Sequence, residues 1–158
     1  MWTDAAGEAI GLRSVPSGLA YRVNSAPANA PVIEELAVEL VRVLERFARD
    51  SGFTQKNPAS IQFGKGTIGH HQVGRATDIY GVGGIGLDKW KARWDARRDG
   101  RSNLGWRLYK ALQVYGRWAQ PYGYPIQLFG PWTREEGPWK FISDRLLAAH
   151  SDHIHVAK

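Results

Sequence analysis

Hydrophobic residues recur every three or four positions between residues 32 and 47, and this spacing predicts an amphipathic α-helix. Pro31 stands at the start of the helix, where its missing N–H costs little, and Gly52 follows the last turn. A second apolar stripe over residues 104–119 predicts another helix, which Pro121 would help to end. Each of these two helices therefore has one apolar face.

Shorter apolar segments bounded by glycine, proline or polar residues predict β-strands. The predicted strands cover residues 19–23, 59–63, 76–80, 124–129 and 153–157. A polar helix is predicted over 88–99 and a short one over 143–149, while the glycine-rich stretch 64–69 and residues 130–140 are predicted to be loops. This mixture of elements predicts an α+β fold in which helices cover one small antiparallel sheet.

Length and composition favour one folded domain. The chain has 158 residues, 43% of them hydrophobic, which suffices for a single core but not for two domains of ordinary size. Residues 1–30, rich in Ala, Gly, Ser, Pro and Asn, are expected to form an N-terminal arm, and residues 31–158 the functional domain. No apolar run is long enough to span a membrane, and no signal peptide is visible, although the chain could be a domain of a longer protein.

The formal net charge of +6 is concentrated between Lys89 and Lys110, here called the basic segment. It contains eight Lys or Arg residues and two acids, which accounts for the whole excess. Such a segment indicates an anionic partner, for example nucleic acid, an anionic cell-wall polymer or a membrane surface. A solvated helix face explains the same charges equally well.

All five histidines lie in two short clusters, one at His70 and His71 and the other between His150 and His155. Each cluster also contains a carboxylate, Asp78 in the first and Asp152 in the second. Since the chain has no cysteine, any metal site must use nitrogen and oxygen ligands. Imidazole combined with carboxylate is a typical ligand set for zinc, so both clusters are candidate parts of one metal site.

Local geometry allows the side chains within each cluster to converge. Gly74 permits a bend between His71 and Asp78, so both can approach one ion although they are seven positions apart. On the last predicted strand, His153 and His155 point to the same side because side chains alternate along a strand. Either pair alone is also compatible with ordinary surface residues.

Taken together, the two clusters resemble the motifs of the LAS-type zinc peptidases. This group includes D-alanyl-D-alanine carboxypeptidases and dipeptidases, penicillin-insensitive murein endopeptidase and phage L-alanyl-D-glutamate endolysins. The first motif, His-x-x-Gly-x-Ala-x-Asp, is matched by His71, Gly74, Ala76 and Asp78. The second is matched by the run His150-x-x-His153-x-His155 near the C-terminus. The resemblance extends over residues 31–158 in the order of the predicted elements.

The resemblance implies a LAS/hedgehog-like fold whose small antiparallel sheet carries one zinc ion per chain. The implied zinc ligands are His71, Asp78 and His155. A water in the fourth position would attack a peptide bond of peptidoglycan, so the resemblance implies an endopeptidase or a carboxypeptidase that acts on stem peptides or cross-links. His153 would act as a general base or oxyanion stabiliser, and Asp152 is the rival general base. The outer His150 would orient a neighbouring side chain or the substrate.

Departures from the family bear on the substrate. Members usually have an arginine before the first motif that binds the substrate carboxylate, whereas this chain has Lys65 in that stretch. Lys65 and Arg75 are the candidate substrate-binding cations, and Gly69 stands where a serine is usual. These differences favour an endopeptidase over a D-Ala-D-Ala dipeptidase. The implied partner is peptidoglycan, reached in the periplasm, in the cell wall or after secretion or injection.

Two other functions remain compatible with the sequence. The basic segment and the pair His70-His71 are compatible with a metal-dependent nuclease of the toxin type. That interpretation lacks the Asn and His that such sites usually place after the first histidine pair, which argues against nucleic acid as the partner. A zinc-binding module of the same fold that binds without catalysis is the third possibility.

Overall fold

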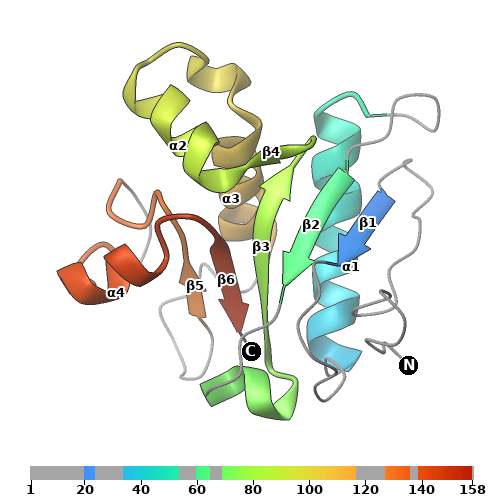
Figure 1. Cartoon of the computed structure of the whole chain (residues 1–158). Coiled ribbons are helices and arrows are strands. Elements are labelled where there is room, and N and C mark those ends of the chain that lie inside the picture. Colours follow the sequence, from blue (N-terminus) through green and yellow to red (C-terminus); the bar gives the residue numbers. More distant parts are fainter. Residues whose placement is uncertain are drawn as a thin grey trace.

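The computed structural model describes residues 20–23, 34–53, 60–64, 69–116, 127–135 and 139–157. Its helices are α1 (Glu34–Asp50), α2 (Leu87–Asp95), α3 (Leu104–Tyr115) and α4 (Asp144–Ala149), with the short 3-10 helices η2 (Gly69–Val73) and η3 (Gly100–Ser102). Its strands are β1 (Ala20–Val23), β2 (Ser60–Gly64), β3 (Ala76–Val82), β4 (Ile85–Gly86), β5 (Gln127–Phe129) and β6 (Ile154–Ala157). Figure 1 shows these elements gathered around one sheet.

Strand β3 is the centre of the sheet. It pairs antiparallel with β2 on one side and with β6 on the other, in the order β1-β2-β3-β6-β5, and β4 folds back onto its end. Strand β1 runs parallel to β2, and the connection between these two strands contains α1. The predicted α+β class is therefore confirmed, with one parallel pair at the edge of an otherwise antiparallel sheet.

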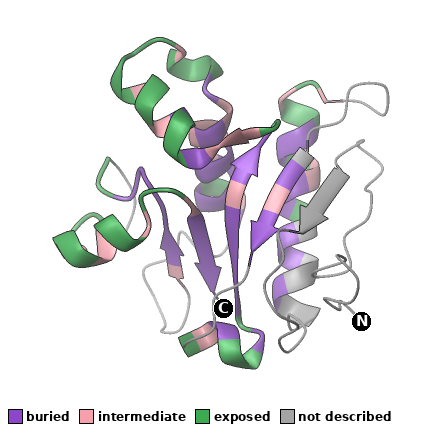
Figure 2. Ribbon diagram, in the orientation of Figure 1, coloured by how far each residue is buried: buried purple, intermediate pink, exposed green. Residues whose placement is uncertain are grey.

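One face of the sheet carries the hydrophobic core. Helices α1 and α3 pack against each other and lie behind the sheet in the view of Figure 1. Ile79, Ile154 and Val156 belong to the core that these helices share with the sheet. Because side chains alternate along a strand, Asp78 and His155 occupy the opposite face. Strands β3 and β6, which carry these two residues, are nevertheless mostly buried (Figure 2).

The structure corrects several predicted boundaries. The polar helix expected over 88–99 ends at Asp95, because Arg97 adopts a left-handed conformation with φ of 54°. The second long helix ends at Tyr115, since Gly116 is extended with ψ of 160°. Strands β3 and β4 form a hairpin that the strand pattern did not predict. Gly83 and Gly84 form its turn, and their positive φ angles suit it.

Other predicted segments lie partly outside the described residues. Most of the N-terminal arm is not described, although the strand expected at 19–23 is present as β1. Of the strand expected at 124–129, the described part is β5. The last strand begins at Ile154, so His153 precedes it and is not part of it. A 3-10 helix, η2, carries the first histidine cluster, where only a bend was predicted.

The junction between α2 and α3 depends on Asn103, which is completely buried. Its side-chain oxygen caps α3 by accepting from the Trp106 N–H at 2.9 Å. Its Nδ2 donates to the Trp90 carbonyl at 2.8 Å, so one side chain ties both helices together. Gly105 allows the close approach, because a Cβ there would lie 2.6 Å from that of Trp90.

We expect Asn103→Ala to lower the free energy of unfolding by about 2–3 kcal/mol, because it removes a helix cap and a buried hydrogen bond. Ser143→Ala is the matched control, since Ser143 caps α4 in the same way but is exposed. Its cost should be about 1 kcal/mol or less. Urea denaturation of the three proteins measures the difference, and equal costs would contradict the role given to Asn103.

Candidate metal centre

Two neighbouring strands bring the two clusters together. In the antiparallel pair of β3 and β6, Asp78 lies directly opposite His155, so both side chains stand on the same face and side by side. Helix η2 supplies His71 from just below these strands (Figure 1). Gly74, with φ of 72°, turns the chain from η2 into β3, as the sequence predicted.

The side chains of His71, Asp78 and His155 form a compact group. Their ligand atoms all lie within 4.8 Å of one another, and all three residues are buried. The Oδ1 atom of Asp78 is 3.4 Å from Nε2 of His71 and 3.0 Å from Nδ1 of His155. Two imidazole nitrogens and one carboxylate oxygen therefore converge on one point, and a metal ion could be held there.

The spacing of this group fits a first-row metal. A tetrahedral zinc ion with ligand distances of about 2.0–2.2 Å keeps its ligand atoms about 3.3–3.6 Å apart. The two distances from Asp78 are 3.4 Å and 3.0 Å, close to that range. Three ligands leave a fourth position open, as in catalytic zinc sites. The ligand set also suits other divalent metals, so the group could hold a metal ion but its geometry does not select which one.

Electrostatics keep Asp78 ionised. Burial alone would raise the pKa of this carboxyl group, but hydrogen bonds from His155 and His71, with the nearby His153, hold it well below its usual range. For His150, burial lowers the pKa of the imidazole, and the neighbouring His153 and His155 lower it further. The centre therefore combines a permanent negative charge with imidazoles, which bind metals when neutral.

The two candidates for the general base, His153 and Asp152, lie at different distances from the convergent group. The Nε2 atom of His153 lies 3.8 Å from Oδ1 of Asp78, so this edge of the ring faces the group. On its other edge, Nδ1 donates a hydrogen bond of 2.7 Å to Asp152. The side chain of Asp152 is 62% exposed and lies beyond His153. Asp152 thus contacts the centre through His153, and His153 contacts it directly.

His150 lies next to His153 and His155 and is not one of the three convergent residues. Its Nδ1 donates to the Leu146 carbonyl at 2.8 Å, which fixes the ring at the end of α4. The ring centroid is 5.0 Å from that of His153 and 5.3 Å from that of His155. His150 therefore packs beside both imidazoles, and the orienting role that the resemblance implies for it stays a prediction.

The remaining candidate residues from the sequence are Lys65, Arg75 and His70. Lys65 lies outside the described residues. Arg75 is described, and its side chain is exposed just before β3. His70 is next to His71 in η2 but is not one of the three buried residues whose ligand atoms converge.

Three residues at the centre were missed by the sequence analysis. Tyr80 packs its ring 4.9 Å from His153 and lies over Gly64. It follows Asp78 by two positions on a predicted strand, and this spacing could have identified it. Nε2 of His155 lies 3.1 Å from Oε1 of Gln127, and the Phe129 ring stacks on the same imidazole with the ring centroids 5.8 Å apart. Both lie on β5, and no local pattern predicts that β5 pairs with β6.

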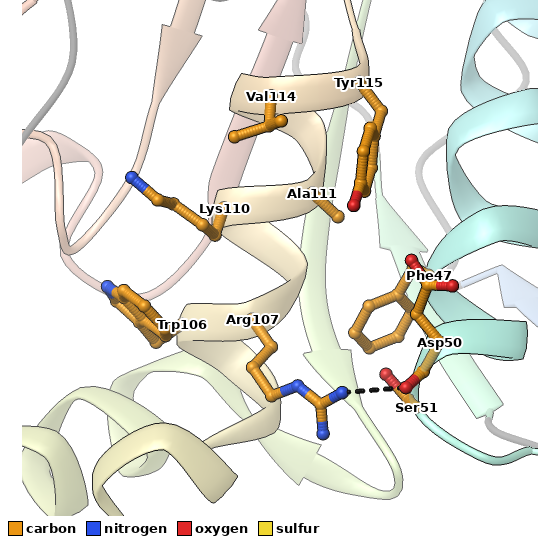
Figure 3. Close-up of a pocket in the computed structure, with 9 residues that line it drawn as sticks. All are labelled: Phe47, Asp50, Ser51, Trp106, Arg107, Lys110, Ala111, Val114 and Tyr115. Carbon is orange, nitrogen blue, oxygen red and sulfur yellow. Dashed lines mark hydrogen bonds between the residues drawn. The ribbon is translucent and has the colours of Figure 1, made fainter.

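A separate pocket with a volume of about 240 Å³ lies between α1 and α3 (Figure 3). Its lining residues are Phe47, Asp50, Ser51, Trp106, Arg107, Lys110, Ala111, Val114 and Tyr115. Arg107 crosses its edge and donates to the Asp50 carbonyl at 3.0 Å (Figure 3). None of the convergent histidines or carboxylates lines it, so the pocket is distinct from the metal centre.

The basic segment is partly paired within the molecule. Lys91 bonds to both Asp95 and Glu135, and Arg93 lies 3.7 Å from Asp99. The exposed cations of the segment include Lys89, Arg97, Arg98 and Arg101. Part of its charge therefore stabilises the fold, and part faces the solvent.

The chain matches no known protein-family model, no curated protein and no solved structure. Within the described residues, no helix has both the length and the apolar character needed to cross a membrane. The fold and the convergent side chains thus define an α+β protein with a candidate metal centre on its sheet.

We expect zinc to stabilise the protein. At a free zinc concentration 100 times the Kd, binding adds about 2.7 kcal/mol, which should raise Tm by about 5–10 °C. His155→Ala should abolish this shift, because it removes one of the three converging ligands. His70→Ala is the matched control and should keep the shift. Differential scanning calorimetry with and without zinc tests this, and an equal shift in both variants would contradict the assigned ligands.

Proposed function

We propose that the protein is a zinc-dependent peptidase that hydrolyses peptide bonds of peptidoglycan. The observation that carries this proposal is the convergence of His71, Asp78 and His155, with His153 directed at the same point. The order and spacing of these residues also match the motifs of the LAS-type zinc peptidases. A zinc ion held by three protein ligands polarises a carbonyl and makes water acidic enough to act as a nucleophile near neutral pH.

Side chains near the metal centre transfer the protons or orient the group that transfers them. Nε2 of His153 takes a proton from the water that adds to the scissile carbonyl carbon, and returns a proton to the amine when the C–N bond breaks. Asp152 accepts a hydrogen bond from Nδ1 of that ring, which leaves Nε2 directed towards the convergent group. His150 packs beside His153 and restricts its movement.

Tyr80 is suited to bind the substrate as a neutral donor. Burial raises the pKa of its phenol, and the carboxylates of Asp78 and Asp152 raise it further. The hydroxyl is therefore protonated near pH 7. Its ring packs on His153, so it lies beside the group that handles the proton. A neutral phenol there can donate a hydrogen bond to a carbonyl oxygen that gains negative charge.

The choice of peptidoglycan rests on the resemblance and on the exposed part of the basic segment, which suits an anionic polymer. An endopeptidase is favoured over a D-Ala-D-Ala dipeptidase, because Lys65 stands in the stretch where the family has its carboxylate-binding arginine. In the described part of the chain, the candidate cation for a terminal carboxylate is Arg75, which is exposed and does not belong to the convergent group. Acting on this substrate would place the protein outside the cytoplasm, in the periplasm or wall or after secretion or injection.

The decisive experiment combines metal analysis with digestion of purified muropeptides. We expect about one zinc per chain in the wild-type protein and new peptide termini in the digest. His155→Ala should lose both, and chelation should abolish the activity of the wild type. Zinc without cleavage would favour a binding module, and absence of zinc after reconstitution would overturn the proposal.

We expect His153→Ala to lower kcat by about 10²–10⁴-fold, because it removes the group that moves the proton. Asp152→Asn should cost less, on the order of tenfold to a hundredfold, because it weakens only the orientation of His153. Asp144→Asn, at an exposed acid outside the group, is the control and should leave kcat unchanged. Steady-state kinetics on a soluble muropeptide decide this. A loss in Asp152→Asn as large as in His153→Ala would make Asp152 the general base.

A metal-dependent nuclease is the second candidate, favoured by the exposed cations of the basic segment. Plasmid DNA incubated with the protein and magnesium would be cut if this candidate is correct. The same assay with His155→Ala shows whether any cutting depends on the metal centre.

A further inference from the structure

Strand β5 presents the side chains of Gln127 and Phe129 to His155, the third candidate ligand. In its antiparallel pairing with β6, Phe129 lies opposite His155, and Gln127 lies opposite Ala157 two positions further along. The Gln127 Oε1 atom is 3.1 Å from Nε2 of His155. The Phe129 ring is stacked on the imidazole, with an angle of 13° between the planes. The ring of His155 is therefore held at its face and at its outer nitrogen.

The two nitrogens of His155 face different partners. Nδ1 lies 3.0 Å from Oδ1 of Asp78, inside the convergent group, while Nε2 points outward to Gln127. A neutral imidazole carries one proton, and the nitrogen without the proton is the one that can bind a metal. In the metal-free protein Nδ1 can donate to the Asp78 carboxylate. A metal ion held by Nδ1 would take the place of that proton, and the one proton of the neutral ring would then lie on Nε2, where the Gln127 oxygen accepts it.

We propose that Gln127 is a positioning residue that holds His155 in the tautomer that binds metal through Nδ1. The inference rests on the proposed metal centre and adds a second layer to it. Histidine ligands commonly donate their other N–H to an oxygen, and loss of that partner typically weakens metal binding by about 10–100-fold. Gln127 fulfils this requirement for His155 with a carboxamide.

The partners of the other imidazoles make this role specific to Gln127. His150 donates to a backbone carbonyl, and His153 donates to the exposed Asp152. Buried Nδ1 of His71 has no hydrogen-bond partner among the described residues. Of the two histidines in the convergent group, His155 is thus the one oriented by a side chain of the described part of the chain.

The test compares zinc affinity among variants at residue 127. Gln127→Leu removes the acceptor at similar size and should raise the Kd for zinc by about 10–100-fold. Gln127→Glu keeps an acceptor and should bind zinc at least as tightly as the wild type. Gln113→Leu is the matched control, because Gln113 on α3 bonds to Lys110 away from the centre. Its Kd should not change. Competition against a chromophoric chelator measures all four values.

Nitrogen-15 NMR of the histidine rings supplies a readout that does not depend on activity. In the zinc-bound wild type, Nε2 of His155 should carry the proton, and Nδ1 should carry none. In zinc-bound Gln127→Leu the nitrogen-15 shift of Nε2 should change, because its proton has lost its acceptor. If this variant does not fold, Gln127→Asn, which shortens the side chain by one methylene, should show the same loss of affinity.

The outcomes separate this inference from the proposed function. Wild-type zinc binding together with an unchanged Kd in Gln127→Leu would overturn the positioning role and leave the peptidase proposal standing. Protonation of Nδ1 in the zinc-bound wild type would also overturn it. A wild-type protein that binds no zinc would overturn both. Weakened binding in Gln127→Leu, rescued in Gln127→Glu, supports the role even if no peptide is cleaved.

Discussion

The antiparallel register between β3 and β6 sets the position of every group at the candidate centre. It places Asp78 opposite His155 and, by alternation, Ile79 opposite Ile154 on the other face. A shift of one residue would turn Asp78 into the core and expose apolar side chains. Packing of α1 and α3 on the apolar face therefore fixes the register on which the polar face depends.

The centre is held by groups that would be costly to bury without partners. Asp78 is 4% exposed, and His71 and His155 are each 7% exposed. Removing a carboxylate from water is unfavourable unless nearby charges or hydrogen bonds compensate. The imidazoles supply hydrogen bonds, and a cation would supply the charge. The same burial that makes the group expensive also strengthens its interaction with a metal, because the surroundings screen charge poorly.

Partners outside the group decide what each imidazole can do. Asp152 binds the outer edge of His153 and so directs the other nitrogen inward, while Gln127 does the same for His155. Asp152 adjoins His153 within the second motif, whereas Gln127 lies on β5, outside both motifs. Tyr80, raised in pKa and packed on His153, adds a neutral donor on the same face of the sheet.

Local sequence determined the elements and the candidate ligands. The apolar repeat located α1, the glycine at 74 predicted the bend before β3, and the family resemblance of the two histidine clusters implied the three residues that converge. The predicted ends of α2 and α3 were wrong. These helices end at Asp95 and Tyr115, because a turn at Arg97 and an extended Gly116 override the periodic pattern. The tertiary structure alone decided that β5 pairs with β6 and that Gln127 reaches His155. Those contacts join segments whose pairing depends on the packed sheet, and no local pattern of residues specifies it.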